Sequence, residues 1–505
     1  MTNLVDRFLN HITMYRLVLY YAAGLLAVTF GLGFSGAVAQ EPTALAFSVV
    51  VITAVCWLTN RLFALLFRVP TNVESVYITA FILALLLPPV TATNLPGLEG
   101  LVLASGVAIA SKFLLAIGRK HVFNPVAIGV VASAYLLDQP ATWWVGGNLF
   151  LLPFALVGGL LVTRKVQRFD MVGAYVLANL AAAMATTAPA MYGEALKQTF
   201  LYSPLLFAGF AMLTEPLTAA QGSWARLIYG GIVGALSSPN IHIGDFYFTP
   251  ELAILAGNVF AFAVNPKRRI KFTLVRIERI ATGCFDFVLR PDRQVSFAPG
   301  QYLDWTMAVR GSDDRGNRRP FTIASAPGED DLRLGVKFYP RASAFKRALA
   351  AMKPGDVIYG SNLAGNFTLP KAKEQKLAFI AGGIGITPFR SMLSDLIARG
   401  DQRSMVMLYG VTRSNEVAYA SLLDRAEREL GMRTVYAVAE GEVRGSNIHR
   451  GFIDAALIQR EIPDFRERTF YVSGPHAMVV RFKSVLRDLG IARSRIKVDY
   501  FPGFA

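Results

Sequence analysis

The sequence predicts a multidomain protein: a ten-helix α transmembrane domain with inverted repeats, followed by a soluble region in which strands alternate with charged helices. Three observations predict this order. The 505 residues exceed what one hydrophobic core usually serves. A mean hydropathy of +0.41 with 53% hydrophobic residues is too apolar for a soluble protein, and the long apolar runs lie within residues 1–266. After the basic sequence NPKRR at 265–269, strand patterns and charged helix patterns replace those runs.

The first domain, residues 1–266, has ten apolar segments that we predict to cross a membrane, since about 20 apolar residues cross a hydrocarbon core. Positive residues such as Arg61, Arg119 and Arg164 fall in alternate loops, and the opposite loops carry only Lys197. By the positive-inside rule, both termini and the second half of the chain face the cytoplasm of a bacterial inner membrane. The segments cover approximately residues 15–35, 43–60, 73–90, 98–117, 124–138, 143–163, 171–190, 201–214, 226–240 and 250–265.

Two of these segments end in similar sequences. Residues 84–92 read ALLLPPVTA and residues 211–219 read AMLTEPLTA, with five of nine positions identical. They close the third and eighth segments, so the two copies run in opposite directions, as in an inverted repeat of five helices. In such folds, interrupted helices meet at a binding site near the midplane. The alternative interpretation is that each proline simply ends an apolar run and the two sequences match by chance. The candidate membrane-site residues are Asn124, Thr214, Glu215 and Pro216.

The composition limits the cofactors and partners. Two cysteines, Cys56 and Cys284, are too few for a cysteine-ligated zinc site or iron–sulfur cluster, and no metal site is predicted. None of the five histidines lies within a predicted span, so no transmembrane haem is expected. The net charge of +16, mostly after residue 269, suits anionic lipid headgroups or an acidic partner. A nucleic-acid partner is not expected.

The membrane half carries two motifs with a recognisable order. They are FNPVAIG at 123–129 and AMLTEPLTAAQGSWARLIYGGIVGAL at 211–236. With the apolar runs, they resemble the membrane subunits B of the sodium-pumping NADH:quinone reductase and D of the Rnf complex, over about residues 15–265. The resemblance implies ten helices in inverted repeats. That family's S/T-x-A-T element for covalent FMN is absent from LLDQPATWWVGGN between the fifth and sixth segments, so we expect no covalent flavin.

The second half carries a longer series of motifs. They include FAPGQYLDW (297–305), RRPFTIASAP (318–327), VKFYPRASAFKRAL (336–349), LAFIAGGIGITPFRSML (377–393), YVSGPHAMV (471–479) and VDYFPGFA (498–505). In this order they resemble the ferredoxin–NADP reductase superfamily over residues 270–505. The resemblance implies an FAD-binding β-barrel in residues 267–372 and an NAD(P)-binding α/β domain in residues 373–505.

The FAD motif of that superfamily appears at residues 319–325. Arg319 offers a planar, permanently charged group to the FAD pyrophosphate, and Phe321 takes the stacking position beside the isoalloxazine in place of the usual tyrosine. Thr322 is the expected hydrogen-bonding and catalytic residue at flavin N5. The resemblance places further cofactor-binding residues along the pyrophosphate and ribityl chain: Ser325, Lys337, Tyr339, Arg341 and Ser343.

The glycine run GGIGITP follows an apolar strand and opens a helix, as in sites for a dinucleotide's pyrophosphate. Ser473 replaces the superfamily's cysteine near flavin N5, so it keeps a hydrogen bond but not the sulfur. Arg413 either binds the 2′-phosphate of NADPH or simply lies in a turn, so the sequence does not decide whether the nucleotide is NADH or NADPH. The expected nucleotide and flavin contacts are Gly382, Gly383, Gly385, Thr387, Pro388, Ser473, Gly474 and Pro475, with Phe501 and Phe504 over the flavin ring.

Together, the two halves predict a membrane-bound flavin-dependent NAD(P)H oxidoreductase. Electrons would pass from cytoplasmic NAD(P)H through FAD to an acceptor in or across the membrane. A hydrocarbon core of roughly 30 Å is too thick for one tunnelling step, so a non-covalent flavin in the membrane half or a quinone would continue the path. The further acceptor would be a quinone, an extracytoplasmic flavoprotein or another electron acceptor. The alternative is a transporter that the fused oxidising domain drives or regulates.

Overall fold

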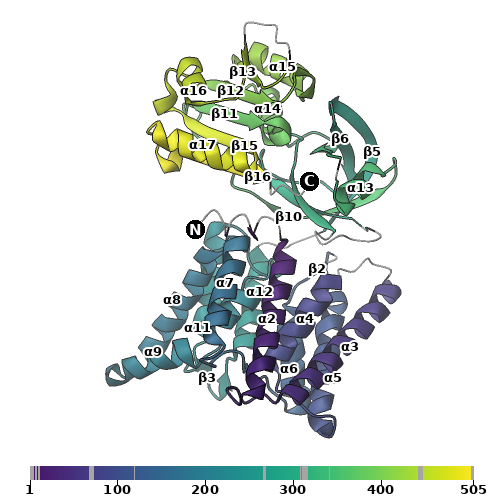
Figure 1. Cartoon of the computed structure of the whole chain (residues 1–505), viewed down its shortest axis with the longest axis vertical. Helices are drawn as coiled ribbons and strands as arrows, with labels where there is room; N and C mark the ends of the chain where they lie inside the picture. The colour runs from purple at the N-terminus through teal and green to yellow at the C-terminus, as the bar shows by residue number, and fades with distance from the viewer. Residues whose placement is uncertain are drawn as a thin grey trace. The chain divides into compact units, whose positions relative to one another are not determined.

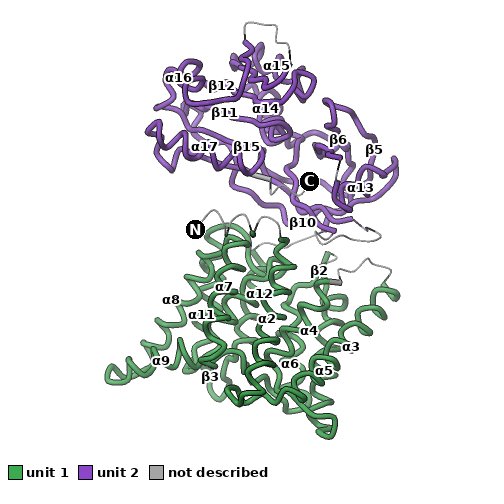
Figure 2. The backbone as a smooth tube through the Cα atoms, in the orientation of Figure 1, with its two compact units in different colours: residues 1–268 green, residues 269–505 purple. Residues whose placement is uncertain are grey.

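The computed structural model describes residues 5, 8–9, 12–67, 73–118, 120–264, 269–307, 309, 317–340, 342–441 and 447–501. The chain divides into two compact units, Met1–Arg268 and Arg269–Ala505, which Figure 2 colours separately. Figure 1 labels most helices of the first unit and several strands of the two large sheets of the second.

The first unit is helical, and four of its described helices are long and apolar enough to cross a membrane: α2, α3, α5 and α8. The count of ten spans stays a prediction. The helices are α2 (Met14–Phe34), α3 (Pro42–Phe67), α4 (Val73–Leu86), α5 (Leu95–Leu114), α6 (Pro125–Leu137), α7 (Leu152–Val166), α8 (Phe169–Thr186), α9 (Tyr192–Leu201), α10 (Leu205–Phe207), α11 (Ser223–Leu236) and α12 (Pro250–Val264).

The two halves of this unit show the same pattern of helix packing, with α5 in the first half corresponding to α11 in the second. Helix α5 packs against α3 and α6, and helix α11 packs against α8 and α12. Large apolar side chains such as Leu58, Leu65 and Leu177 remain exposed on the outside of the helices. An exposed apolar exterior of this kind is what lipid contact requires.

Both sequence interruptions are real breaks in helical structure. Helix α4 ends at Leu86, and its last carbonyls are capped from another loop: the Trp144 indole Nε1 donates to the carbonyls of Ala84 (3.1 Å) and Leu87 (2.9 Å). In the second copy, the short helix α10 continues into a π-helical turn, Ala208–Met212. The expected eighth segment, 201–214, is therefore not one continuous α-helix, because the π turn changes the hydrogen-bonding pattern partway along it.

The second unit begins with a six-stranded antiparallel sheet. Its order is β8-β7-β10-β5-β6-β9, and Trp305, Phe272, Phe287 and Phe345 are fully buried in its core. The strands are β5 (Ile270–Ala281), β6 (Cys284–Pro291), β7 (Tyr302–Thr306), β8 (Arg318–Thr322), β9 (Leu332–Lys337) and β10 (Val357–Ala364). Helix α13 (Ala344–Ala350) lies between β9 and β10 in the chain.

The chain then forms a six-stranded parallel sheet of order β14-β13-β12-β11-β15-β16. All six residues of β11 are buried, because separate hydrophobic clusters cover the two faces of the sheet. The strands are β11 (Leu377–Gly382), β12 (Met405–Val411), β13 (Arg433–Val438), β14 (Ile448–Arg450), β15 (Thr469–Pro475) and β16 (Ile496–Phe501). The helices are α14 (Thr387–Arg399), α15 (Ala420–Leu430), α16 (Ala455–Glu461) and α17 (His476–Asp488).

Candidate functional site

Strand β8 presents Arg319 and Phe321 on one face, as alternation along a strand requires. Both lie beside the Phe345 ring: the Arg319 guanidinium carbon is 5.6 Å from the ring centre and the Phe321 ring is 5.9 Å from it. Arg319 is buried, and its Nη1 donates to the Arg318 carbonyl at 2.7 Å. The sequence motif thus becomes a buried guanidinium next to a partly exposed aromatic ring, a suitable pair for a phosphate and a planar ring system.

Thr322 points to the other face and meets the last strand of the parallel sheet. Its hydroxyl donates to Asp499 Oδ2 at 3.4 Å, and Asp499 is the register partner of Ser473. Burial raises the pKa of Asp499 to about 6, and the Thr322 hydrogen bond opposes that rise. Sequence reasoning singled out Thr322 and Ser473 but missed Asp499, whose only signal was an acid within the apolar sequence VDYF.

The Ser473 hydroxyl is fully buried and has no hydrogen-bond partner among the residues that the structure describes. A buried hydroxyl without a partner costs about 1–3 kcal/mol, so an external partner at this position would relieve the penalty. This observation fits a polar ring atom of a flavin or a nicotinamide as that partner. Asp499 connects the two residues, because it accepts the Thr322 hydroxyl and is the register partner of Ser473.

The glycine run forms the turn between β11 and α14. Gly383 has φ +52°, a 3-10 turn covers Gly383–Ile386, and Thr387 and Pro388 begin the helix. A Cβ on Gly385 would lie 2.5 Å from the Ser473 carbonyl oxygen and 2.6 Å from Gly474 Cα, so no larger residue fits. The loop thus packs directly on Ser473–Gly474. It leads into the N-terminus of α14, and N–H groups at a helix N-terminus favour an anion.

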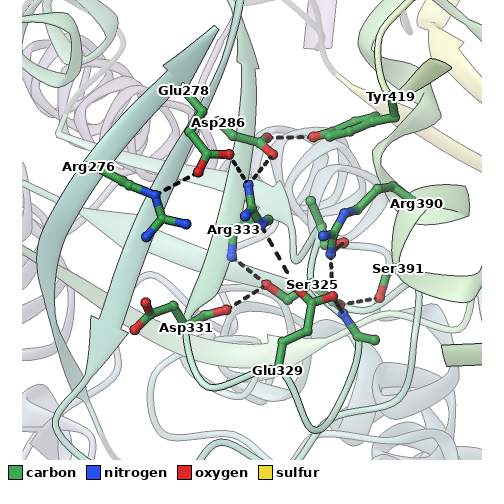
Figure 3. A network of polar contacts seen from close by, with 12 residues as sticks. Arg276, Glu278, Asp286, Ser325, Glu329, Asp331, Arg333, Arg390, Ser391 and Tyr419 are labelled. Carbon is green, nitrogen blue, oxygen red and sulfur yellow. Dashed lines mark hydrogen bonds and ion pairs between the residues drawn. The ribbon is translucent and has the colours of Figure 1, made fainter. Parts of the chain in front are cut away.

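A polar network joins the antiparallel sheet to the parallel one (Figure 3). Fully buried Asp286 on β6 accepts the Tyr419 hydroxyl at 2.5 Å and lies 3.3 Å from Arg333 Nη1. Burial raises the pKa of Asp286, although the hydrogen bond from Tyr419 and the nearby arginines oppose the rise. The network fixes the two sheets to each other within this unit, and hence fixes Thr322 relative to Ser473.

Ser325 belongs to the same network. Its hydroxyl donates to the Asp331 carbonyl (3.1 Å) and accepts from the Arg333 backbone (2.5 Å), while its carbonyl accepts from Ser391 (2.6 Å). Ser325 was expected at the cofactor, but its hydroxyl already connects segments of the protein. The sequence motif did not distinguish these two uses.

The other expected flavin contacts lie in β9 and the segment after it. Lys337 Nζ pairs with Glu416 Oε2 at 2.6 Å, and the Ser343 hydroxyl caps α13 by accepting from the Lys346 backbone at 3.3 Å. Tyr339 is 42% exposed, with the Lys346 ammonium 5.1 Å from its ring centre. Two expected residues, Arg341 and Phe504, fall outside the described residues, as does the Phe501 side chain.

In the helical unit, Glu215 is part of a polar cluster after the π turn. Its Oε1 lies 3.5 Å from His121 Nε2, and its Oε2 accepts the Thr218 hydroxyl at 3.0 Å. Thr214 is buried and donates to the Phe210 carbonyl at 2.6 Å, and Pro216 follows Glu215 in the turn. The sequence identified Glu215, but it did not identify His121, which lies 94 positions away.

Asn124, three residues after His121 in the sequence, takes part in a chain of hydrogen bonds that connects helices α6, α12 and α11. Its side-chain oxygen caps α6 by accepting from the Ala127 backbone at 3.1 Å, and its own backbone N–H donates to Asn258 at 2.7 Å. Asn258, fully buried in α12, donates to the Tyr229 hydroxyl on α11 at 3.1 Å. Asn124 therefore caps α6 and also anchors α6 to α12.

A buried acid of the helical unit, Glu251, was not singled out from the sequence. It is 3% exposed and accepts the Trp143 indole N–H at 3.0 Å. Trp143 has φ +49°, an uncommon conformation for a bulky residue, so the loop between α6 and α7 is locally strained. Glu251 lies in the first turn of α12, where acidic residues are common, so the sequence pattern gave no reason to single it out.

Within the described part of the chain, no group of three or more His, Cys, Asp or Glu side chains is arranged to hold a metal ion. Both cysteines are buried and unbridged.

Comparison with known proteins adds to this geometry. A sequence family described as "Oxidoreductase NAD-binding domain" matches residues 379–483. The chain is 29% identical over 243 residues to a flavohemoprotein of Bacillus cereus, covering 46% of this chain and 60% of that protein. It is 26% identical over 241 residues to an NADPH oxidoreductase of Mycobacterium tuberculosis, with the same two coverages. The C-terminal unit is an FAD/NAD(P)H oxidoreductase domain.

The chain also resembles the solved FAD/NAD-binding domain of a nitric oxide dioxygenase from Vibrio cholerae. The TM-score is 0.42 at 20% identity, covering 46% of this chain and 98% of that one. The chain spans about 60% of the length of the curated relatives above. Part of the chain is similar to a curated flavohemoprotein and an NADPH oxidoreductase, whereas the resemblance of residues 15–265 to membrane subunits stays a prediction.

Proposed function

We propose that this protein is a membrane-bound, FAD-dependent NAD(P)H oxidoreductase that passes electrons from cytoplasmic NAD(P)H to an acceptor in or across the membrane. One observation carries the proposal: a single chain joins an oxidoreductase domain to a helical unit with four membrane-length apolar helices. The proposed boundaries are residues 1–266 for the membrane domain, 267–372 for the FAD domain and 373–505 for the nucleotide domain. The proposed location is a bacterial inner membrane.

The residues of the oxidoreductase domain have separate proposed roles. Arg319 holds the FAD pyrophosphate, and Phe321 stacks on the ring system. Thr322 and Ser473 hydrogen-bond the reacting edge, and Asp499 holds Thr322 by the 3.4 Å contact. Bound FAD supplies the chemistry of accepting two electrons from NAD(P)H and releasing them singly. The turn Gly382–Pro388 binds the pyrophosphate of the nucleotide through backbone N–H groups.

In the membrane domain, we propose that the two interrupted segments form one site, with Asn124, Thr214, Glu215 and Pro216 around it. The matched packing of α5 and α11 supports the inverted repeat. The cluster of Glu215, His121 and Thr218 supports a polar ligand there, since buried ionisable groups within a membrane are costly and mark functional sites. The proposed ligand is a non-covalent flavin or a quinone.

The interrupted helices also favour a second candidate, a transporter that the oxidoreductase domain drives or regulates. Flavin content separates the two. Purified protein in detergent is assayed for flavin per chain and bleached anaerobically with NAD(P)H. Two flavins per chain, both bleached, support a flavin relay. One flavin with NAD(P)H-dependent reduction of an added quinone supports the quinone path, and one flavin with no electron transfer beyond it contradicts both and favours the transporter.

A further inference from the structure

Two side chains of opposite charge lie at the carboxyl ends of neighbouring strands β12 and β13. Val411 and Val438, the last residues of these strands, are register partners. Beyond them, the Ala439 N–H donates to the Val411 carbonyl at 3.1 Å and the Glu440 N–H to the Thr412 carbonyl at 2.8 Å. The backbone ladder therefore continues past both strands and fixes Glu440 beside Arg413, whose Nε is 3.4 Å from Glu440 Oε2.

The strand order places this pair on the adenosine side of the nucleotide site. In open α/β sheets, ligands bind outside the carboxyl ends of the strands. The phosphate-binding turn follows β11, and Ser473 lies on β15, which is next to β11 on one side. Strands β12 and β13 lie on the other side of β11. With the nicotinamide at Ser473 and the pyrophosphate at the turn, the adenosine ribose extends toward β12 and β13.

The charges there distinguish the two nucleotides. A carboxylate accepts a hydrogen bond from the free ribose 2′-hydroxyl of NADH, as acidic residues do in other dinucleotide sites. The 2′-phosphate of NADPH carries additional negative charge that the same carboxylate repels. Arg413 alone would attract that phosphate, but its pairing with Glu440 leaves no net positive charge. Resting on the nucleotide site proposed above, we propose that Glu440 is a specificity-determining residue that makes the oxidoreductase domain select NADH over NADPH.

The size of the effect is modest, because both side chains are mostly exposed and solvent screens their charges. We expect wild-type kcat/KM for flavin reduction to favour NADH. Glu440→Gln removes the repulsion but keeps the side-chain size, and should raise kcat/KM for NADPH by roughly five- to tenfold. The matched control is Glu429→Gln on α15, which breaks an exposed pair with Arg425 at 2.6 Å and should change neither nucleotide's value.

Binding of adenosine fragments tests the same residue without hydride transfer. Full-length protein in detergent is titrated calorimetrically with adenosine 2′,5′-bisphosphate and with 5′-AMP. Glu440→Gln should tighten binding of the bisphosphate relative to 5′-AMP, and Glu429→Gln should not. Wild-type preference for NADPH, or an unchanged fragment ratio in Glu440→Gln, overturns the inference. Failure of both nucleotides to reduce the flavin would instead contradict the proposed function, while the fragment ratio would still decide the role of Glu440.

Discussion

Asp499 is a partly buried carboxylate whose ionisation opposes folding, so its replacement by Asn should stabilise the oxidoreductase domain. Burial raises its native pKa to about 6, with the Thr322 hydrogen bond opposing the rise, whereas Asp in an unfolded chain ionises near pH ~3.9. The native state therefore binds this proton more tightly than the unfolded state. The resulting stability is fully present below the unfolded pKa and is lost as pH rises through the native pKa.

The size of the effect follows from the two pKa values. A rise of about two units corresponds to about 3 kcal/mol lost at pH 8, and about half of that is lost at pH 5. For a domain of this size, 1 kcal/mol moves Tm by about 2–4 °C. Asp499→Asn keeps an oxygen to accept the Thr322 hydroxyl and should raise Tm by about 6–12 °C at pH 8 and by about half as much at pH 5.

The assay follows flavin fluorescence while full-length protein in detergent is heated at pH 5 and at pH 8. A fixed excess of FAD keeps the ligand-linked stabilisation constant between samples. Asp488→Asn, at the exposed end of α17, is the matched control and should leave Tm nearly unchanged. An equal gain at both pH values, or a lower Tm for Asp499→Asn at pH 8, would refute the reasoning from burial.

Three further predictions concern cofactor, nucleotide and membrane sites. Arg319→Ala should weaken FAD binding about 10- to 100-fold in a fluorescence titration, since charge-assisted hydrogen bonds are lost; unchanged affinity would contradict its role. Gly385→Ala places a Cβ 2.5 Å from the Ser473 carbonyl and should slow flavin reduction at least about tenfold by stopped flow, with FAD content retained. Glu215→Gln should impair electron transfer to the acceptor while flavin reduction by NAD(P)H stays normal; equal loss of both would mean that Glu215 only supports the fold.

Local sequence patterns determined the two-part organisation of the protein and much of the oxidoreductase site. The apolar strand LAFIA, the glycines after it and the helix start at Thr387–Pro388 are contiguous, so their periodicity and turn chemistry already predict β11, the turn and α14. Alternation along β8 likewise predicts that Arg319 and Phe321 share a face. Each of these inferences needs only a few neighbouring residues.

Only the tertiary structure decided which distant residues meet. Asp499 reaches Thr322 because β16 adds to β15 as the edge strand of the parallel sheet, and Glu215 lies beside His121 because helical packing joins segments 94 positions apart. The acid Glu251 and the pair of Arg413 with Glu440 became visible for the same reason. Sequence periodicity specifies which face a residue occupies, whereas strand order and helix packing specify what that face contacts.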